Sequence, residues 1–164
     1  PTSANLFTLA RRGYTRLPEL ACAGNADACR DREAAKSMDW GHLSEVSYSF
    51  QNLFGRERPT LGGMGTGAAG VLMVDASPVV RRAVKRLWIN PLANSTNHGE
   101  RGQNALMTDG RVQWLTSPVL KGGENIWLPH FIEQAIAKRP KPTQADPING
   151  TETPQGSDDV FVGP

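Results

Sequence analysis

A β-hairpin predicted in the second half of the chain constrains the fold more than any other feature of the sequence. Ala105 and Met107 alternate with other residues before the triplet Thr108-Asp109-Gly110, and Val112 and Trp114 alternate after it. An Asp-Gly pair between two such runs is a strong short-range signal for two antiparallel strands joined by a tight turn. The aspartate of this pair tolerates the left-handed backbone that such a turn requires.

Other segments of the chain predict a small α+β fold. Helical spacing of apolar residues, capping residues and helix-favouring composition indicate short helices, while period-two alternation or a continuous apolar run indicates strands. The 17 glycines and 12 prolines favour many turns and loops. We therefore predict short N-terminal helices followed by a small antiparallel sheet that contains the hairpin. The expected elements are helices at residues 4–13, 30–37 and 132–137, and strands at residues 45–51 and 71–74.

Charge and glycine patterns exclude two classes of ligand. The net charge of +2 is far from the cationic excess that nucleic-acid-binding domains concentrate on one face. A basic cluster at residues 81–86 is interpreted as a solvated face, because no aromatic ladder accompanies it. Residues 65–70 have the glycine spacing of a dinucleotide-binding loop, but they precede an apolar strand instead of following one. Neither nucleic acid nor nucleotide is expected as a partner.

Two cysteines, Cys22 and Cys29, are separated by a short loop that contains Gly24 and Asn25. Such a loop can bring two Cα atoms to the distance that a disulfide needs, and disulfides are common in small domains of oxidising compartments. We expect a disulfide between them. Two buried thiols are the alternative, and a metal site is less favoured because no further cysteine or nearby histidine completes a tetrahedral set.

Asp75, His98 and Asp109 form the candidate site of the sequence. Asp75 ends the apolar strand 71–74, so its carboxylate is expected at a sheet edge where loops such as 94–102 gather. One histidine and two carboxylates are adequate ligands for a divalent cation such as calcium. The alternative is structural, with Asp75 capping a strand end, His98 bonded to loop backbone and Asp109 in the turn. No Gly-x-Ser-x-Gly or His-Glu-x-x-His motif supports an enzyme.

The segment around His98 also resembles the C-terminal signature of prepilin-like proteins of planctomycetes and their relatives, a domain named for a histidine followed at short range by Asp-Gly. Further blocks that resemble this family lie at residues 5–14, 47–52, 71–75, 124–126 and 159–162. Two departures are visible: ten residues separate His98 from Asp109, one more than in the family, and Arg111 replaces a second histidine. The residues that carry the signature are Asn97, His98, Gly99, Gly102, Asn104, Asp109, Gly110, Val112 and Trp114.

The resemblance implies a structural or assembly protein. Such proteins carry a basic leader and a long apolar anchor helix, whereas this chain opens at Pro1-Thr2-Ser3 without an apolar run of that length. We therefore expect a pilin-like head without its N-terminal anchor, located in the cell envelope, in the periplasm or outside the cell. Its implied partners are other pilin-like subunits of a type IV pilus or type II secretion system, or other envelope proteins. Contact with a membrane would depend on the missing helix.

The chain is expected to divide into a single head domain at residues 1–138 and an extended, proline-rich tail at residues 139–164. The apolar end of the tail, at residues 160–162, is expected to dock as a clasp on this chain or on a neighbouring subunit. The loops at residues 53–69 and 90–102 are expected to face outward. Two other functions stay open from sequence alone: a metal-dependent enzyme built on Asp75 and His98, and a periplasmic ligand-binding module.

Overall fold

A computed structural model describes residues 3–52, 70–137, 148–153 and 159–163 of the chain. It shows an α+β fold built on one five-stranded antiparallel sheet, as the sequence predicts. The strand order in the sheet is β4-β3-β2-β1-β5. The strands are β1 (Tyr48–Gln51), β2 (Val71–Asp75), β3 (Gln103–Met107), β4 (Val112–Leu115) and β5 (Val162–Gly163).

The helices are short, in keeping with the glycine and proline content. Three are α-helices, and the remaining helical turns in the described residues are 3-10 turns. The α-helices are α1 (Ser3–Arg11), α2 (Pro78–Ala83) and α3 (His130–Ala137). The 3-10 turns are η1 (Leu17–Leu20), η2 (Ala34–Lys36), η3 (Leu43–Glu45) and η4 (Thr96–His98). None of the helices in the described ranges combines the length and the apolar character needed to cross a membrane.

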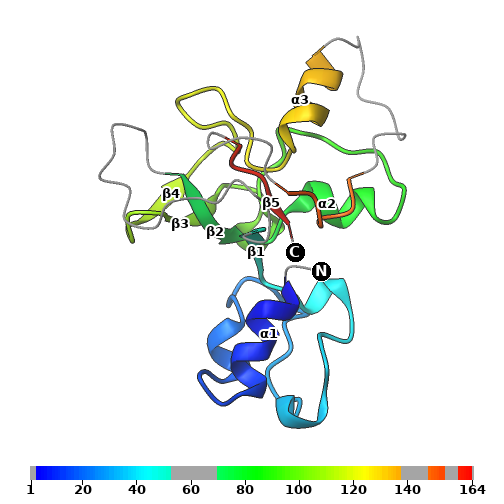
Figure 1. Cartoon of the computed structure of the whole chain (residues 1–164), viewed down its shortest axis with the longest axis vertical. Coiled ribbons are helices and arrows are strands. Elements are labelled where there is room, and N and C mark those ends of the chain that lie inside the picture. The colour runs from blue at the N-terminus through cyan, green and yellow to red at the C-terminus, as the bar shows by residue number, and fades with distance from the viewer. Residues whose placement is uncertain (1–2, 53–69, 138–147, 154–158, 164) are drawn as a thin grey trace.

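The N-terminal residues form a small lobe of their own, coloured blue to cyan in Figure 1, at one end of the molecule. Helix α1 buries Phe7 and Ala10 against Leu17, and Trp40 packs edge-on against Phe7. The predicted helix at residues 4–13 is therefore present as α1, and its Leu9 side chain is exposed. The predicted helix at residues 30–37 is wrong, because only the single turn η2 forms there.

A larger core lies between the sheet and the segments that cover it. Side chains of β2 and β3, of α2 and of the start of α3 meet there with the end of the chain. Helix α2 was not predicted, although its start carries a recognisable signal: Ser77 caps it by accepting a hydrogen bond from the Val80 amide, and Pro78 occupies the first turn. The fully buried core residues include Val71, Val74, Val79, Val80, Ala105, Ile126, Trp127, Phe161 and Val162.

Strand β1 turns a polar face inward. Ser49 and Gln51 are buried, whereas Tyr48 and Phe50 are half-buried, so the apolar residues of the predicted strand do not mark its core face. Two of the buried polar atoms have partners: Ser49 Oγ accepts from the Ser77 amide at 2.8 Å, and Gln51 Nε2 donates to the carbonyl of Asp159 at 3.0 Å, whereas Oε1 of Gln51 has no hydrogen-bond partner among the described residues. These hydrogen bonds offset the cost of burying polar side chains.

The end of the chain belongs to the main body. Ile148, Val160 and Phe161 lie in the large core, and β5 pairs with β1 through Phe50↔Gly163 and Gln51↔Val162. The described parts of the predicted tail, residues 148–153 and 159–163, thus supply core residues and an edge strand of the same sheet. They dock on their own chain, as a clasp. The expected outward loop at residues 53–69 and most of the glycine-rich motif at 65–70 lie outside the described residues.

Candidate functional site

Asp75 stands at the end of β2 with its side chain almost completely buried, at 1% exposure. Burying a carboxylate is costly unless hydrogen bonds replace its water. Here the Asn104 backbone amide donates to Oδ2 at 2.6 Å, and the Asn97 side-chain amide donates to Oδ1 at 3.3 Å. The same Nδ2 atom of Asn97 also donates to the Ser47 carbonyl at 2.8 Å. Asp75 therefore links β2 to the loop before β3 and to β3 itself.

His98 is held next to Asp75 by a short capped turn. Ser95 caps η4 by accepting from the Asn97 amide, and Gly99 ends the turn in the left-handed region at φ 63°. The Nε2 atom of His98 lies 3.0 Å from Asp75 Oδ2, and its ring packs edge-on against Trp114 with centroids 5.3 Å apart. The imidazole is 28% exposed, so one side of the pair opens to solvent.

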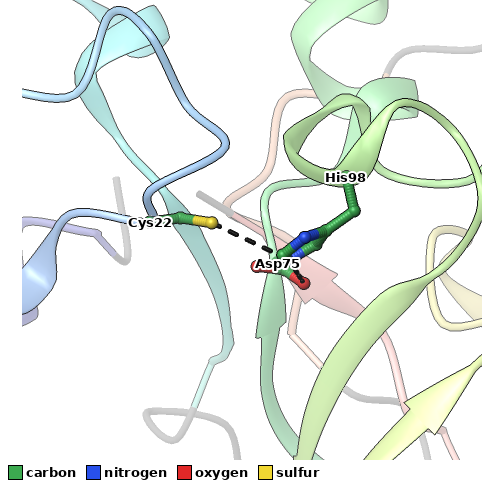
Figure 2. Close-up of side chains that lie close together, drawn as sticks. All are labelled: Cys22, Asp75 and His98. Atoms are coloured by element: carbon green, nitrogen blue, oxygen red, sulfur yellow. Dashed lines mark hydrogen bonds and ion pairs between the residues drawn. The ribbon is translucent and has the colours of Figure 1, made fainter.

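Cys22 reaches the same point from the N-terminal lobe (Figure 2). Its Sγ atom lies 3.7 Å from His98 Nε2, and its side chain is buried. Its carbonyl accepts hydrogen bonds from the Asn25 amide at 3.1 Å and from the Arg30 guanidinium at 3.0 Å, which fix the loop. The thiol, the carboxylate and the imidazole all lie within 4.8 Å of one another. Figure 2 shows the three side chains converging from separate segments.

The loop after Cys22 is in direct contact with the loop that carries His98. A Cβ atom at Gly24 would overlap the carbonyl oxygen of Asn97, so the two backbones touch at a place where no larger residue fits. This glycine is therefore required by close approach and not by its φ angle. The contact keeps Cys22 and His98 close together at the boundary between the lobe and the sheet.

Tyr48 and Asn104 lie beside the cluster. Tyr48 pairs with Asp75 across β1 and β2. Burial raises the pKa of Tyr48, and the neighbouring Cys22 and Asp75 raise it further. The side chain of Asn104 completes the cluster, with Nδ2 at 3.1 Å from His98 Nε2 and 3.4 Å from Asp75 Oδ2. A single ring nitrogen of His98 thus faces a carboxylate, an amide and a thiol.

Asp109 does not join the other two predicted ligands. It lies in the turn of the β3–β4 hairpin, where its carboxylate accepts from the Arg111 amide at 3.0 Å and from its guanidinium at 2.7 Å. These bonds hold the pKa of Asp109 below its usual value. The structure therefore corrects the predicted set of Asp75, His98 and Asp109: it brings together the first two and adds Cys22. Asp109 has the structural role that its Asp-Gly context indicates.

The predicted disulfide is not formed in this structure. Cys22 and Cys29 are both free thiols, the first buried and the second partly exposed. Sequence reasoning missed the role of Cys22 because its close spacing to Cys29 suggested a bridge. Its actual neighbour His98 is 76 positions away, and no local pattern relates two residues at that separation.

The glycines of the signature shape the hairpin and the loop that leads into it. Gly99 and Gly110 adopt left-handed backbones, with φ 63° and 85°. Gly102 touches β4: a Cβ atom there would lie 2.5 Å from the Leu115 carbonyl oxygen and 2.6 Å from the Trp114 ring. These glycines let the loop from His98 fold back tightly onto the hairpin.

A second group of possible ligands lies at the start of α3. Glu124, His130 and Glu133 place their ligand atoms within 4.8 Å of one another, and all three are half-buried. His130 Nδ1 is 3.7 Å from Glu124 Oε2. Burial and then the charge of Glu124 raise the pKa of Glu133. This group is not among the sites predicted from the sequence.

Comparison with known proteins found no matching family model, no matching curated protein and no matching solved structure.

Proposed function

We propose that this chain is a structural and assembly subunit: the head of a prepilin-like protein of the cell envelope, located in the periplasm or outside the cell. Its partners on this proposal are other pilin-like subunits. It works by packing and strand pairing, without turnover. The proposal draws on the resemblance of the His98 segment and on an α+β fold whose antiparallel sheet includes the expected hairpin.

The observation that carries the proposal is the outer edge of the sheet at β4. This strand is last in the strand order and pairs with β3 alone among the described strands. Two large apolar side chains on it are exposed, Val112 at 68% and Trp114 at 47%. An open edge strand with exposed apolar residues is a template for pairing with another chain. A neighbouring subunit would cover this apolar pair.

The polar cluster supports the same conclusion. Both oxygens of Asp75 are used by hydrogen bonds from Asn97 and Asn104, and His98 packs against Trp114 of the hairpin. These contacts join β2, β3, β4 and the η4 loop into one unit. The signature residues thereby present β4 in a fixed position, which is what a subunit interface needs.

Replacing Val112 by lysine should disrupt this interface. We expect a photo-cross-linking residue at Gln113, placed in the chromosomal copy of the gene, to give adducts with pilin-like subunits in the envelope fraction. Val112→Lys should reduce these adducts roughly tenfold, since about 1.4 kcal/mol lost at an interface has that effect. The adducts are measured by immunoblotting and identified by mass spectrometry.

Leu92→Lys is the matched control, because Leu92 is 65% exposed but lies in a turn outside the sheet. It should leave the adducts unchanged. Adducts that are insensitive to Val112→Lys would reject β4 as the interface. A protein that fractionates with the cytosol and gives no envelope adduct would reject the assembly function.

A further inference from the structure

Three side chains that are far apart in the sequence direct metal-binding atoms to one point. Cys22 comes from the N-terminal lobe, Asp75 from the end of β2 and His98 from η4 (Figure 2). We propose that Sγ of Cys22, Oδ2 of Asp75 and Nε2 of His98 bind one zinc ion. This inference is independent of the proposed assembly function, and it replaces the predicted ligand Asp109 with Cys22.

The distances between the ligand atoms suit zinc. Around a tetrahedral zinc with Zn–S of about 2.3 Å and Zn–N or Zn–O of about 2.0–2.1 Å, neighbouring ligand atoms lie roughly 3.3–3.6 Å apart. Here Sγ to Nε2 is 3.7 Å, and Nε2 to Oδ2 is 3.0 Å. Shifts of a few tenths of an ångström would bring both pairs to the ideal separation. Such shifts lie within ordinary side-chain movement.

The residues around the three ligands are those of a built site. The Asn104 amide donates to Oδ2 of Asp75 at 2.6 Å, and Asn97 donates to Oδ1, so the carboxylate is oriented before a metal binds. Hydrogen bonds of this kind around metal ligands raise affinity by fixing their direction. The loop of Cys22 is fixed by Arg30 at its carbonyl.

A fourth ligand position is also available. The side-chain amide of Asn104 lies beside Nε2 of His98, and rotation of this amide would direct its oxygen to the metal in place of its nitrogen. Water is the other candidate, because His98 is 28% exposed and opens the cluster to solvent. The same opening gives the ion a path of entry.

The donor set selects zinc over calcium. Calcium takes six to eight oxygen ligands, whereas a thiolate and an imidazole favour a softer ion such as zinc. The Cys22 ligand is the thiolate, so binding releases the thiol proton, and Nε2 of His98 binds the ion through its lone pair.

Zinc would tie the N-terminal lobe to the sheet. Cys22 belongs to the lobe, and the other two ligands belong to the sheet and its loop. Because a ligand that binds only the folded state stabilises it, zinc should raise the midpoint of thermal unfolding. The rise should depend on Cys22.

The test uses the full chain, purified under reducing conditions and stripped with a chelator. We expect cobalt(II), titrated as a spectroscopic probe, to give a thiolate-to-cobalt charge-transfer band that saturates at one cobalt per chain, and zinc to displace it. Cys22→Ser should abolish the band, and His98→Ala should weaken zinc binding roughly a hundredfold or more. Zinc affinity is measured by competition with a chromophoric chelator.

Two control variants make the assignment specific. Cys29→Ser leaves the Cys22 thiol in place, and His130→Ala removes the histidine of the second group of possible ligands, at the start of α3. Both should bind zinc like the unaltered chain, and circular dichroism should show that all four variants are folded. Absence of a thiolate band in the unaltered chain would overturn the proposal. So would binding that survives Cys22→Ser but is lost in Cys29→Ser or His130→Ala.

Discussion

Asp75→Ala is expected to lower the free energy of unfolding by about 3 kcal/mol, measured in the presence of a chelator so that no metal contributes. The substitution removes a carboxylate that is 1% exposed, leaves the Asn104 backbone amide without its acceptor, and leaves the Asn97 side chain with the Ser47 carbonyl as its remaining acceptor. Hydrogen bonds to charged groups contribute about 1.5–3 kcal/mol, and each buried donor left unpaired adds a penalty. Urea unfolding followed by tryptophan fluorescence gives the value.

Asp109→Ala is the comparison for this variant, because it removes the other aspartate of the predicted site. Asp109 bonds to its near neighbour Arg111 at the surface of the hairpin turn, and surface substitutions of this kind cost about 0.5 kcal/mol. Equal losses of unfolding free energy in the two variants would show that Asp75 contributes no more to stability than Asp109 does.

Gly24→Ala is expected to destabilise the chain by about 3 kcal/mol as well, for a steric reason. The added methyl group would overlap the carbonyl oxygen of Asn97, and backbone atoms cannot move aside as a flexible side chain can. Overpacking of this kind costs about 1–3 kcal/mol and forces backbone shifts. The loops of Cys22 and His98 must then separate, so the same variant should also bind zinc more weakly.

Gly122→Ala is the matched control for Gly24→Ala. No atom lies within 4 Å of a Cβ built at Gly122, so its free energy of unfolding should change by less than about 0.5 kcal/mol. A Gly24→Ala protein with the stability of the unaltered chain would show that the lobe and the η4 loop are not held in contact in solution.

The features that could be predicted from sequence are local ones. The hairpin follows from alternation on both sides of Asp109-Gly110, and β2 follows from a continuous apolar run, because period and turn chemistry act over a few residues. The approach of Asp75 to His98 was also predictable, since a strand end and a neighbouring loop meet at a sheet edge. The fold class was predicted from the order of these elements, and the structure shows it.

The features that could not be predicted depend on tertiary contacts. The core face of β1 carries Ser49 and Gln51, whose Oγ and Nε2 atoms bond to partners distant in sequence, so the apolar pattern of that strand is misleading. Residues 30–37 have helix-favouring composition, but only one turn forms, because Ala34 is the one apolar residue of this stretch that packs against the Phe7 cluster of the lobe. Cys22 joins the site through packing of the whole lobe, which no spacing rule describes.

The pairing of β1 with β5 fixes when the molecule can finish folding. Gln51 of β1 bonds to Asp159, 108 positions later, and β5 is formed by residues 162 and 163. Closing so long a loop is slow, because its entropy must be lost before the contact forms. During synthesis, the edge of β1 that pairs with β5 must therefore wait until residue 163 has emerged. A nascent chain stalled before residue 159 would leave that edge of the sheet open to chaperones and proteases.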